Sequence, residues 1–280
     1  AAAAATADHG VASAIVPGAV ERTSLDLAAT YDVTARLSWA ARSLRVWTTI
    51  ELTNASGGPI DRLELNTVAA RLGRMRLGTV SVDGAKVAAT VDDQTILVPL
   101  GGVLPDGGSA TVTVQFSATL RSGVAGSDWM FTRANGITDL YRWVPWISRR
   151  RTFDRPNHGD PFVTPVASRV TLRIATDRRL QIAVNGRRTA LSADGLSQTF
   201  VAENVRDLPV TAAPDYRITT GTVDGVTVKV YARPGAPAST MLSWARRALH
   251  RMAALVGPYP YATLVVAQSA GGYGMEGPGV

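Results

Sequence analysis

The chain has 280 residues, of which 46% are hydrophobic and 18% are charged. This composition is typical of a globular protein of one large or two ordinary domains, and it excludes an intrinsically disordered chain. The chain has no cysteine and a formal net charge of +7, so disulfides and thiolate metal sites are excluded.

The positive charge is carried mostly by scattered arginines, because lysine occurs only at Lys86 and Lys229. A polyanion-binding surface usually needs its cations clustered on one face, and the longest basic run is Arg149-Arg150-Arg151. We therefore expect no nucleic-acid partner. No apolar run approaches the roughly 20 residues that cross a bilayer, so we expect no membrane span.

Residues 1–24 begin with an alanine-rich segment that lacks the basic start and long apolar core of an intact signal peptide. The segment is compatible either with the remnant of a removed signal peptide or with a low-complexity tail, and we expect it to be flexible. The first interpretation predicts an extracytoplasmic or secreted protein. The alanine- and arginine-rich composition is typical of a bacterial, GC-rich genome.

Residues 25–221 are predicted to form a β domain. Apolar and polar residues alternate over 31–38 and 44–52, as they do in strands that bury one face. Turn pairs such as Asp83-Gly84 and Asn185-Gly186 separate further short runs of the same kind. This regular spacing predicts a mainly β fold, built as an antiparallel sandwich or a large curved sheet. The further strands of this domain are expected at 62–66, 79–82, 86–91, 95–99, 110–120, 167–174, 180–184 and 196–202, and one more strand, at 226–231, follows the domain boundary.

The segment 127–165 has poor periodicity but is rich in aromatic residues. Trp129, Phe131, Trp143 and Trp146 predict that it packs against the core. We expect a long structured loop here, lying over a pair of strands.

Residues 222–280 are predicted to be a small α/β segment. A helix over 239–256 is expected, with Ser239 as its N-cap and one apolar stripe. Gly257-Pro258 ends that helix. The next run, 263–267, is apolar on both faces, so it predicts a buried strand. The stripe consists of Leu242, Ala245, Leu249, Met252 and Val256.

A glycine-rich loop follows that strand, with five glycines in the nine residues 271–279. Glycine lets the backbone adopt positive φ and approach a ligand closely. Glu276 is the only charged residue after Arg251, and a lone carboxylate on such a loop can hold a cationic group. The alternative is a frayed end without a binding role. A literal G-x-G-x-x-G at 272–277 does not predict a dinucleotide site, because Pro278 and Gly279 oppose the helix that such a site needs.

No catalytic residue or metal ligand is predicted in this chain. The three histidines, His9, His158 and His250, form no His-Glu-x-x-His pair and no other spacing typical of zinc ligands. No G-x-S-x-G nucleophile motif is present. Asp92-Asp93 is interpreted as a turn rather than as a carboxylate pair.

The loop resembles the Gly-x-Met-Glu-Asn exopeptidase motif of the M1 family of zinc aminopeptidases, which are gluzincins. The Met-Glu pair of the motif falls on Met275 and Glu276, whereas its first Gly falls on Tyr273 and its Asn on Gly277. As in that family, a Gly-Pro-Tyr-Pro-Tyr turn and a strand precede the loop, here at 257–266. Two further segments, 142–145 and 204–209, also resemble the family, so the resemblance covers roughly residues 25–280.

The resemblance implies that 25–221 is a saddle-shaped N-terminal β domain and that 222–280 opens a thermolysin-like catalytic domain. It implies an aminopeptidase that removes N-terminal residues from peptides, with Glu276 binding the substrate's α-amino group. The other substrate-binding residues that it implies are Tyr273, Gly274, Met275 and Gly277. The zinc motif of the family lies downstream of this loop, so zinc is expected outside the chain, which by itself is expected to be inactive.

Two alternatives from other classes remain open. The first is a non-catalytic β-sandwich module that binds carbohydrate or mediates adhesion, and it predicts an exposed row of tryptophans on one sheet face. The second is a structural β domain that supports a partner.

Overall fold

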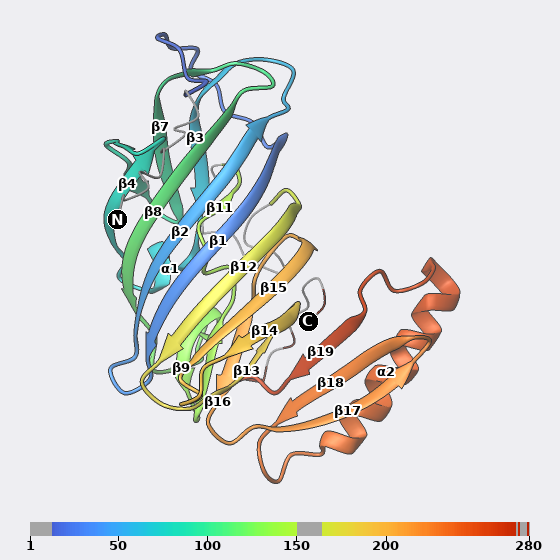
Figure 1. Cartoon of the computed structure of the whole chain (residues 1–280). Helices are drawn as coiled ribbons and strands as arrows, with labels where there is room; N and C mark the ends of the chain where they lie inside the picture. The colour runs from blue at the N-terminus through green and yellow to red at the C-terminus, as the bar shows by residue number, and fades with distance from the viewer. Residues whose placement is uncertain (1–12, 150–163, 273, 275–278, 280) are drawn as a thin grey trace, which may run out of the picture.

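The computed structural model describes residues 13–149, 164–272, 274 and 279, which form four β-sheets and few helices (Figure 1). The largest sheet has eight strands in the order β14-β15-β12-β1-β2-β8-β4-β5. Its strands are β1 (Leu27–Ser38), β2 (Ser43–Asn54), β4 (Arg76–Val82), β5 (Ala85–Lys86), β8 (Ser109–Thr119), β12 (Ala167–Thr176), β14 (Arg187–Leu191) and β15 (Ser197–Val205). The mainly β fold predicted from the sequence is confirmed.

The long strands of this sheet bury one face and expose the other, because successive side chains of a strand point to opposite faces. On β2, for example, Leu44, Val46, Thr48 and Ile50 are buried, whereas Arg45, Trp47 and Thr49 lie on the outer face. Neighbouring strands are antiparallel except β1 and β12, which are parallel. A parallel pair requires a long connection, and the chain passes through the smaller sheets before β12 begins.

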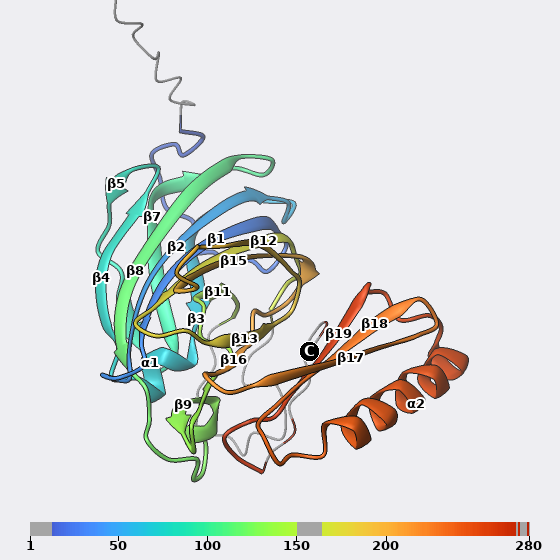
Figure 2. The same ribbon diagram turned by 60° about the horizontal axis from the view of Figure 1, so that its bottom comes forward.

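Two four-stranded sheets pack on the buried face of the large sheet (Figure 2). The first, in the order β11-β3-β7-β6, contains β3 (Ile60–Asn66), β6 (Thr90–Asp92), β7 (Thr95–Leu104) and β11 (Trp146–Ile147). The second, in the order β13-β16-β10-β9, contains β9 (Phe131–Ala134), β10 (Ile137–Leu140), β13 (Gln181–Val184) and β16 (Val210–Ala213). Two short helices accompany them, α1 (Val68–Leu72) and the 3-10 helix η1 (Asp128–Met130).

The C-terminal part is a three-stranded sheet with a helix on one face (Figure 2). Its strands are β17 (Arg217–Val223), β18 (Val226–Ala232) and β19 (Thr263–Ala267), and the helix is α2 (Ala238–Val256). The helix connects β18 to its parallel neighbour β19, as expected for a crossover connection. The α/β character predicted for this segment is confirmed. The predicted division at residue 221 falls inside β17, and the domain limits stay a prediction.

Three details of this C-terminal part differ from the sequence predictions. The helix starts at Ala238 with Pro237 at the N-cap position, so the prediction of Ser239 as N-cap is wrong. The predicted apolar stripe is only partly buried, since Met252 is 49% and Val256 is 76% exposed. The strand β19 is half-buried except at Val265, because it pairs with a sheet strand on one side only. Within the part of the chain that the structure describes, no helix is long and apolar enough to cross a membrane.

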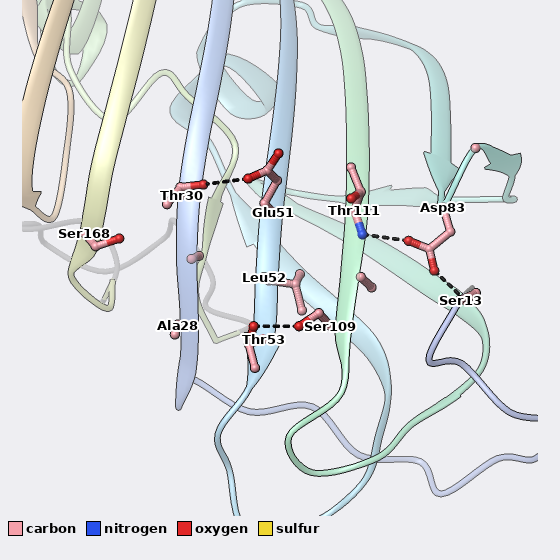
Figure 3. A pocket seen from close by; sticks show the side chains of 13 residues that line it. Ser13, Ala28, Thr30, Glu51, Leu52, Thr53, Asp83, Ser109, Thr111 and Ser168 are labelled. Atoms are coloured by element: carbon pink, nitrogen blue, oxygen red, sulfur yellow. Dashed lines mark hydrogen bonds between the residues drawn. The ribbon is translucent and has the colours of Figure 1, made fainter. Parts of the chain in front are cut away.

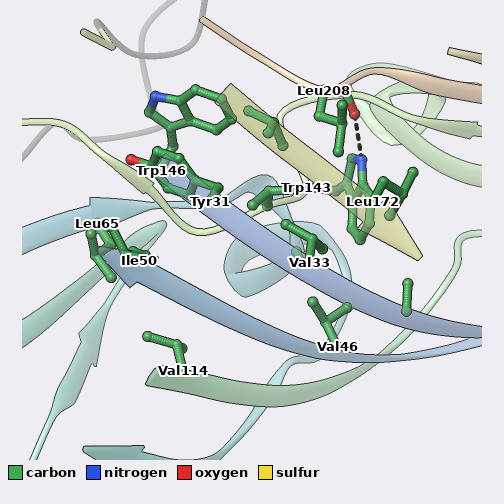
Figure 4. Close-up of a cluster of buried hydrophobic side chains, with 14 of the residues drawn as sticks. Tyr31, Val33, Val46, Ile50, Leu65, Val114, Trp143, Trp146, Leu172 and Leu208 are labelled. Carbon is green, nitrogen blue, oxygen red and sulfur yellow. Dashed lines mark hydrogen bonds between the residues drawn. The ribbon is translucent and has the colours of Figure 1, made fainter. Parts of the chain in front are cut away.

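Buried aliphatic and aromatic side chains, including Tyr31, Trp143 and Trp146, pack between the sheets (Figure 4). Phe131, Trp143 and Trp146 are buried, as predicted for the segment 127–165. That segment is not simply a loop, however, because it also forms η1, β9, β10 and β11. The ring of Tyr31 stacks on Trp146 with 4.2 Å between centroids, and its hydroxyl accepts the N–H of Ile147 at 3.1 Å. Burial raises the pKa of Tyr31.

A buried ion pair joins the end of β10 to the link between β15 and β16. Arg142 and Asp207 are 4% and 3% exposed, with 3.6 Å between Arg142 Nε and Asp207 Oδ2. Arg142 Nη1 also donates to the carbonyl of Arg206 at 2.7 Å. Next along the chain, Trp143 Nε1 donates to the carbonyl of Leu208 at 2.7 Å. We call these five residues the clamp.

The first prediction concerns the charge inside the clamp. Asp207→Asn keeps the shape of the side chain but removes the negative charge that Asp207 places beside the buried Arg142 guanidinium, so it should lower the free energy of unfolding by about 3 kcal/mol or more. Urea unfolding measures this change. The matched control is Asp32→Asn, which breaks the exposed ion pair with Arg173 and should cost less than about 1 kcal/mol. Equal losses in the two variants would contradict the role assigned to the clamp.

Candidate functional site

The glycine-rich loop begins from a strand end that is fixed by three hydrogen bonds to Gln268. The N–H of Gln268 donates to the carbonyl of Tyr231 at 2.8 Å, which extends the pairing of β19 with β18. Its side-chain Oε1 accepts the N–H of Arg233 at 2.9 Å. Its own carbonyl accepts the hydroxyl of Tyr216. The entry to the loop is therefore held in one direction.

Two residues further on, Ala270 docks into the β domain. Its N–H donates to Asp139 Oδ2 at 2.7 Å, and its carbonyl accepts Asn135 Nδ2 at 2.8 Å. Both partners come from the β9–β10 hairpin, whose turn residues Asn135 and Gly136 have φ of +50° and +76°, as a two-residue turn of this hand requires. The side chain of Ala270 is buried in a small apolar cluster. The cluster consists of Ala134, Ile137, Ala213, Tyr216 and Ala270.

Asp139 is an ionisable group almost excluded from water. It lies on β10 opposite Thr211 of β16 and is 6% exposed. Burial raises the pKa of Asp139 to about 6, although the N–H of Ala270 and the hydroxyl of Thr211 partly offset that rise. Burial also raises the pKa of Tyr216, and the nearby charge of Asp139 adds to the effect. Hence the Asp139 carboxyl, which holds Ala270, changes its charge as the pH passes through about 6.

Arg233 ties the hairpin, the loop entry and the linker before β17 together. Its Nε lies 3.0 Å and its Nη2 2.8 Å from Asp215 Oδ2, a bidentate ion pair, and its Nη1 donates to the carbonyl of Asn135 at 2.8 Å. The bonded Arg233 guanidinium lowers the pKa of Asp215. We call Asn135, Asp139, Tyr216, Arg233 and Gln268 the loop anchor.

The far flank of the loop is fixed as well. The carbonyl of Gly279 accepts the N–H of Val265 on the open edge of β19 at 2.8 Å. Gly279 has φ of +82°, and a methyl group added there would lie 3.4 Å from Cβ of Asn185. In the preceding turn, Tyr261 donates its hydroxyl to the carbonyl of Asn204 at 3.1 Å. The described residues at the two ends of the loop, Ala270 and Gly279, are thus both held by hydrogen bonds.

The predicted substrate-binding residues lie between these two flanks. Gly274 is exposed. Tyr273, Met275, Glu276 and Gly277 lie outside the residues that the structure describes, so their assignment stays a prediction. What the structure brings together is the loop anchor, which sequence reasoning missed. Only the Asn135-Gly136 turn pair signals the hairpin; Asp139, Tyr216 and Arg233 stand in no motif.

The described residues do not fit a zinc site. His9 and His158 lie outside the described part of the chain, and His250 is exposed on α2, where Nδ1 lies 2.8 Å from Asp224 Oδ2. Among the described residues, no group of three or more His, Asp or Glu side chains is placed to hold a metal ion. We therefore derive no chemical step through zinc from this chain's own residues.

A hollow of about 720 Å³ lies on the outer face of the large sheet, lined mainly by hydroxyl side chains and two carboxylates (Figure 3). Asp83 accepts the N–H of Thr111 at 2.7 Å and the hydroxyl of Ser13, and Glu51 lies 3.5 Å from the hydroxyl of Thr30. None of its lining residues belongs to the glycine loop or to the loop anchor. We do not place the functional site here, because these polar groups already bond one another.

The row of exposed tryptophans that a carbohydrate-binding module would need is absent, since all six tryptophans lie in the part that the structure describes. Trp39, Trp143 and Trp146 are buried, and Trp47 and Trp129 are half-buried. Trp244 alone is exposed, and it lies on α2 rather than on a sheet.

No protein-family model and no curated protein matches the chain. Solved structures do resemble it. A mutant of the M1 zinc metallopeptidase from Deinococcus radiodurans matches with a TM-score of 0.62 and 18% identity, over 91% of this chain and 58% of that chain. The enzyme itself matches with a TM-score of 0.61 and 18% identity, over 92% and 59%. A mutant bound to a Tyr-Ser-Ala substrate matches with 0.60 and 18%, over 91% and 59%.

At this identity the likeness shows the fold alone. The chain therefore has the fold of the corresponding part of M1 zinc metallopeptidases, and it spans less than two thirds of the length of these structures.

The second prediction concerns the pH dependence that Asp139 gives to stability. Between pH 4 and pH 6 the folded chain keeps a proton on Asp139 that the unfolded chain, with the ordinary pKa of 3.8, has already lost. The contribution of Asp139 to stability therefore falls as pH rises through this window, by on the order of 3 kcal/mol. Asp139→Asn cannot ionise, so its stability relative to wild type should rise between pH 4 and pH 7 in urea unfolding.

Asp61 provides a control of opposite sign. Although burial opposes it, the N–H groups of Val20, Glu21 and Arg22 lower the pKa of Asp61. Asp61→Asn should therefore be less stable than wild type at pH 7, with the difference shrinking as pH falls. If Asp139→Asn differed from wild type by the same amount at every pH, the buried carboxylate would have no raised pKa.

Proposed function

We propose that this chain supplies the N-terminal β domain and the opening of the catalytic domain of an M1-type zinc aminopeptidase, and that its loop 271–278 receives the free amino end of a peptide. The observation that carries the proposal is the loop itself. The sequence places a carboxylate and four glycines between Ala270 and Gly279, two residues that hydrogen bonds hold in place, in a fold shared with M1 zinc metallopeptidases.

Glu276 is assigned the recognition of the substrate's α-amino group. That group has a pKa near 8, so it is mostly protonated at neutral pH and attracts a carboxylate. A peptide blocked at its amino end offers no such charge, and the pair therefore favours exopeptidase action. Gly274 and Gly277 are assigned to the substrate backbone, since glycine permits close approach, and Tyr273 and Met275 complete the proposed set of substrate-binding residues.

The fixed flanks favour tight binding because they reduce the freedom that the loop loses when a ligand binds. Ala270 is held by Asp139 and Asn135, and Gly279 is held by Val265. A short loop between two such points has fewer conformations than a free chain end. This arrangement supports a binding loop over a frayed end.

The zinc of the proposed enzyme is assigned to a part of the polypeptide outside these 280 residues. When bound, zinc acts as a Lewis acid and lowers the pKa of a bound water. This chain's own contribution is to bind and orient the peptide's amino end. One of the similar structures carries a Tyr-Ser-Ala substrate, and a short peptide is the partner that we propose here. An extracytoplasmic location, inferred from residues 1–24, belongs to the same proposal.

The third prediction tests the role of Glu276 in the full-length gene product. Glu276→Ala should lower kcat/KM for an unblocked aminoacyl anilide by about 100-fold or more, since it removes one partner of a desolvated charge pair. Slow hydrolysis of the N-acetylated substrate should not change, because that substrate has no ammonium group.

Glu203→Ala is the matched control for this test. Glu203 lies in an exposed ion pair with Arg169 at 4.0 Å, and its removal should leave both rates unchanged. An equal loss on blocked and unblocked substrates in Glu276→Ala would remove the assignment of Glu276 to the amino group.

The fourth prediction is that the 280-residue chain by itself hydrolyses no aminoacyl anilide, with or without added zinc. Purified chain and substrate suffice for the measurement. Zinc-dependent turnover would mean that these residues contain a complete catalytic site.

A further inference from the structure

A second hollow, of about 380 Å³, lies on the outer face of the large sheet and is lined by arginines and hydroxyl groups. It lies near the start of β2 and β4 and the end of β8. Its polar lining consists of Ser43, Arg45, Arg74, Arg76, Ser117 and Thr119. No lining residue is a carboxylate, in contrast to the hollow with Glu51 and Asp83 on the same face.

The strand register places these side chains in a regular array. Arg45 of β2 and Arg76 of β4 both lie opposite Ser117 of β8, so two arginines flank one central hydroxyl. In the next row on the same face, Ser43 lies opposite Thr119. Neighbouring strands are about 4.8 Å apart, so the backbones that carry the two arginines are about 10 Å apart. That separation suits a small ligand held from both sides.

Arg74 completes the array from the end of β8. The N–H of Thr119 donates to the carbonyl of Gly73 at 2.7 Å, which brings the residue after Gly73 next to the central hydroxyls. A methyl group at Gly73 would lie 2.8 Å from the Phe131 ring and 2.9 Å from Cβ of Ala118. The turn is therefore packed against the core and fixes where Arg74 leaves it.

Positive side chains face one another at this hollow, and no carboxylate among the lining residues offsets their charge. Arg45 lies directly opposite Arg36 of β1, and like charges at opposed strand positions destabilise a sheet. Two other arginines on this face have acidic partners, namely Arg173 with Asp32 and Arg169 with Glu203. Within the described part of the chain, no ion pair or side-chain hydrogen bond engages the polar residues that line the hollow. An anionic ligand would supply the missing negative charge.

We propose that this hollow is a binding site for a tetrahedral oxyanion, namely a phosphate or sulfate group. The guanidinium groups of Arg45 and Arg76 bind it from two sides and that of Arg74 from the end, since the guanidinium fork matches the oxygens of such ions. The hydroxyls of Ser117 and Thr119 donate from the floor. The site is separate from the peptide-binding loop, because it shares no residue with the loop or with the loop anchor.

The test is a titration of the protein with inorganic phosphate, and in parallel with inorganic sulfate, at constant ionic strength set by chloride. The arginine Nε–H signals in NMR spectra report binding. Saturable shifts confined to Arg45, Arg74 and Arg76 are expected. Arg45→Ala and Arg76→Ala should each weaken binding at least tenfold, and Arg169→Ala, an exposed arginine on the same face, should leave it unchanged.

Unfolding in chloride alone separates a binding defect from a folding defect. Arg76→Ala should unfold at the same or a higher urea concentration than wild type, because it relieves the repulsion among the arginines. A sulfated disaccharide is titrated in the same way. If it binds more tightly than inorganic sulfate, the ligand is a sulfated glycan, and if the two bind equally, the ligand is the free ion. Linear, unsaturated shifts, or equal weakening by Arg169→Ala, would overturn the proposal.

Discussion

The buried ion pair between Arg142 and Asp207 is the constraint on which the arrangement of the site depends. A guanidinium group taken out of water must be paired and hydrogen-bonded, or it costs several kcal/mol. Here the pair fixes the end of β10 to the link that precedes β16. Those two strands are partners in one sheet, and Asp139 lies in their pairing. The carbonyl of Asp207 also accepts Asn185 Nδ2 at 2.9 Å, and Asn185 lies against Gly279. The residues that hold both flanks of the loop are thus connected to the same buried ion pair.

In the loop anchor, burial of Asp139 lowers the stability of the fold but fixes the position of Ala270. An ionised Asp139 is disfavoured by burial, yet its acceptor oxygen is what holds the N–H of Ala270. Strain or desolvation of this kind is typical of functional regions, where the surrounding fold over-determines an unfavourable group. Arg233 contributes in the opposite sense, because its bidentate pair with Asp215 is half-exposed and well aligned. The two together place the loop entry between the β domain and the three-stranded sheet.

The outer face of the large sheet has acidic residues toward one end of its strands and arginines toward the other, and no sequence motif predicts this separation. Acidic residues and hydroxyls gather near the Ser109 end of β8, and arginines gather near its Thr119 end. On β2, Glu51 and Arg45 are six residues apart, which is about 20 Å along a strand. This separation arises because β1, β2 and β8 are long and pair in continuous register, so that residues distant in sequence line up in rows.

The sequence by itself determined the mainly β fold, most of the strands, the helix over 239–256 and the burial of Trp143 and Trp146, because periodicity and turn residues are local signals. It also located the glycine-rich loop with its carboxylate, Glu276, whose binding role stays a prediction. Only the tertiary structure decided the parallel pairing of β1 with β12, the loop anchor around Asp139 and the arginine array beside Ser117. Each of these joins residues far apart in the chain, where propensity and spacing carry no information and packing alone selects the partner.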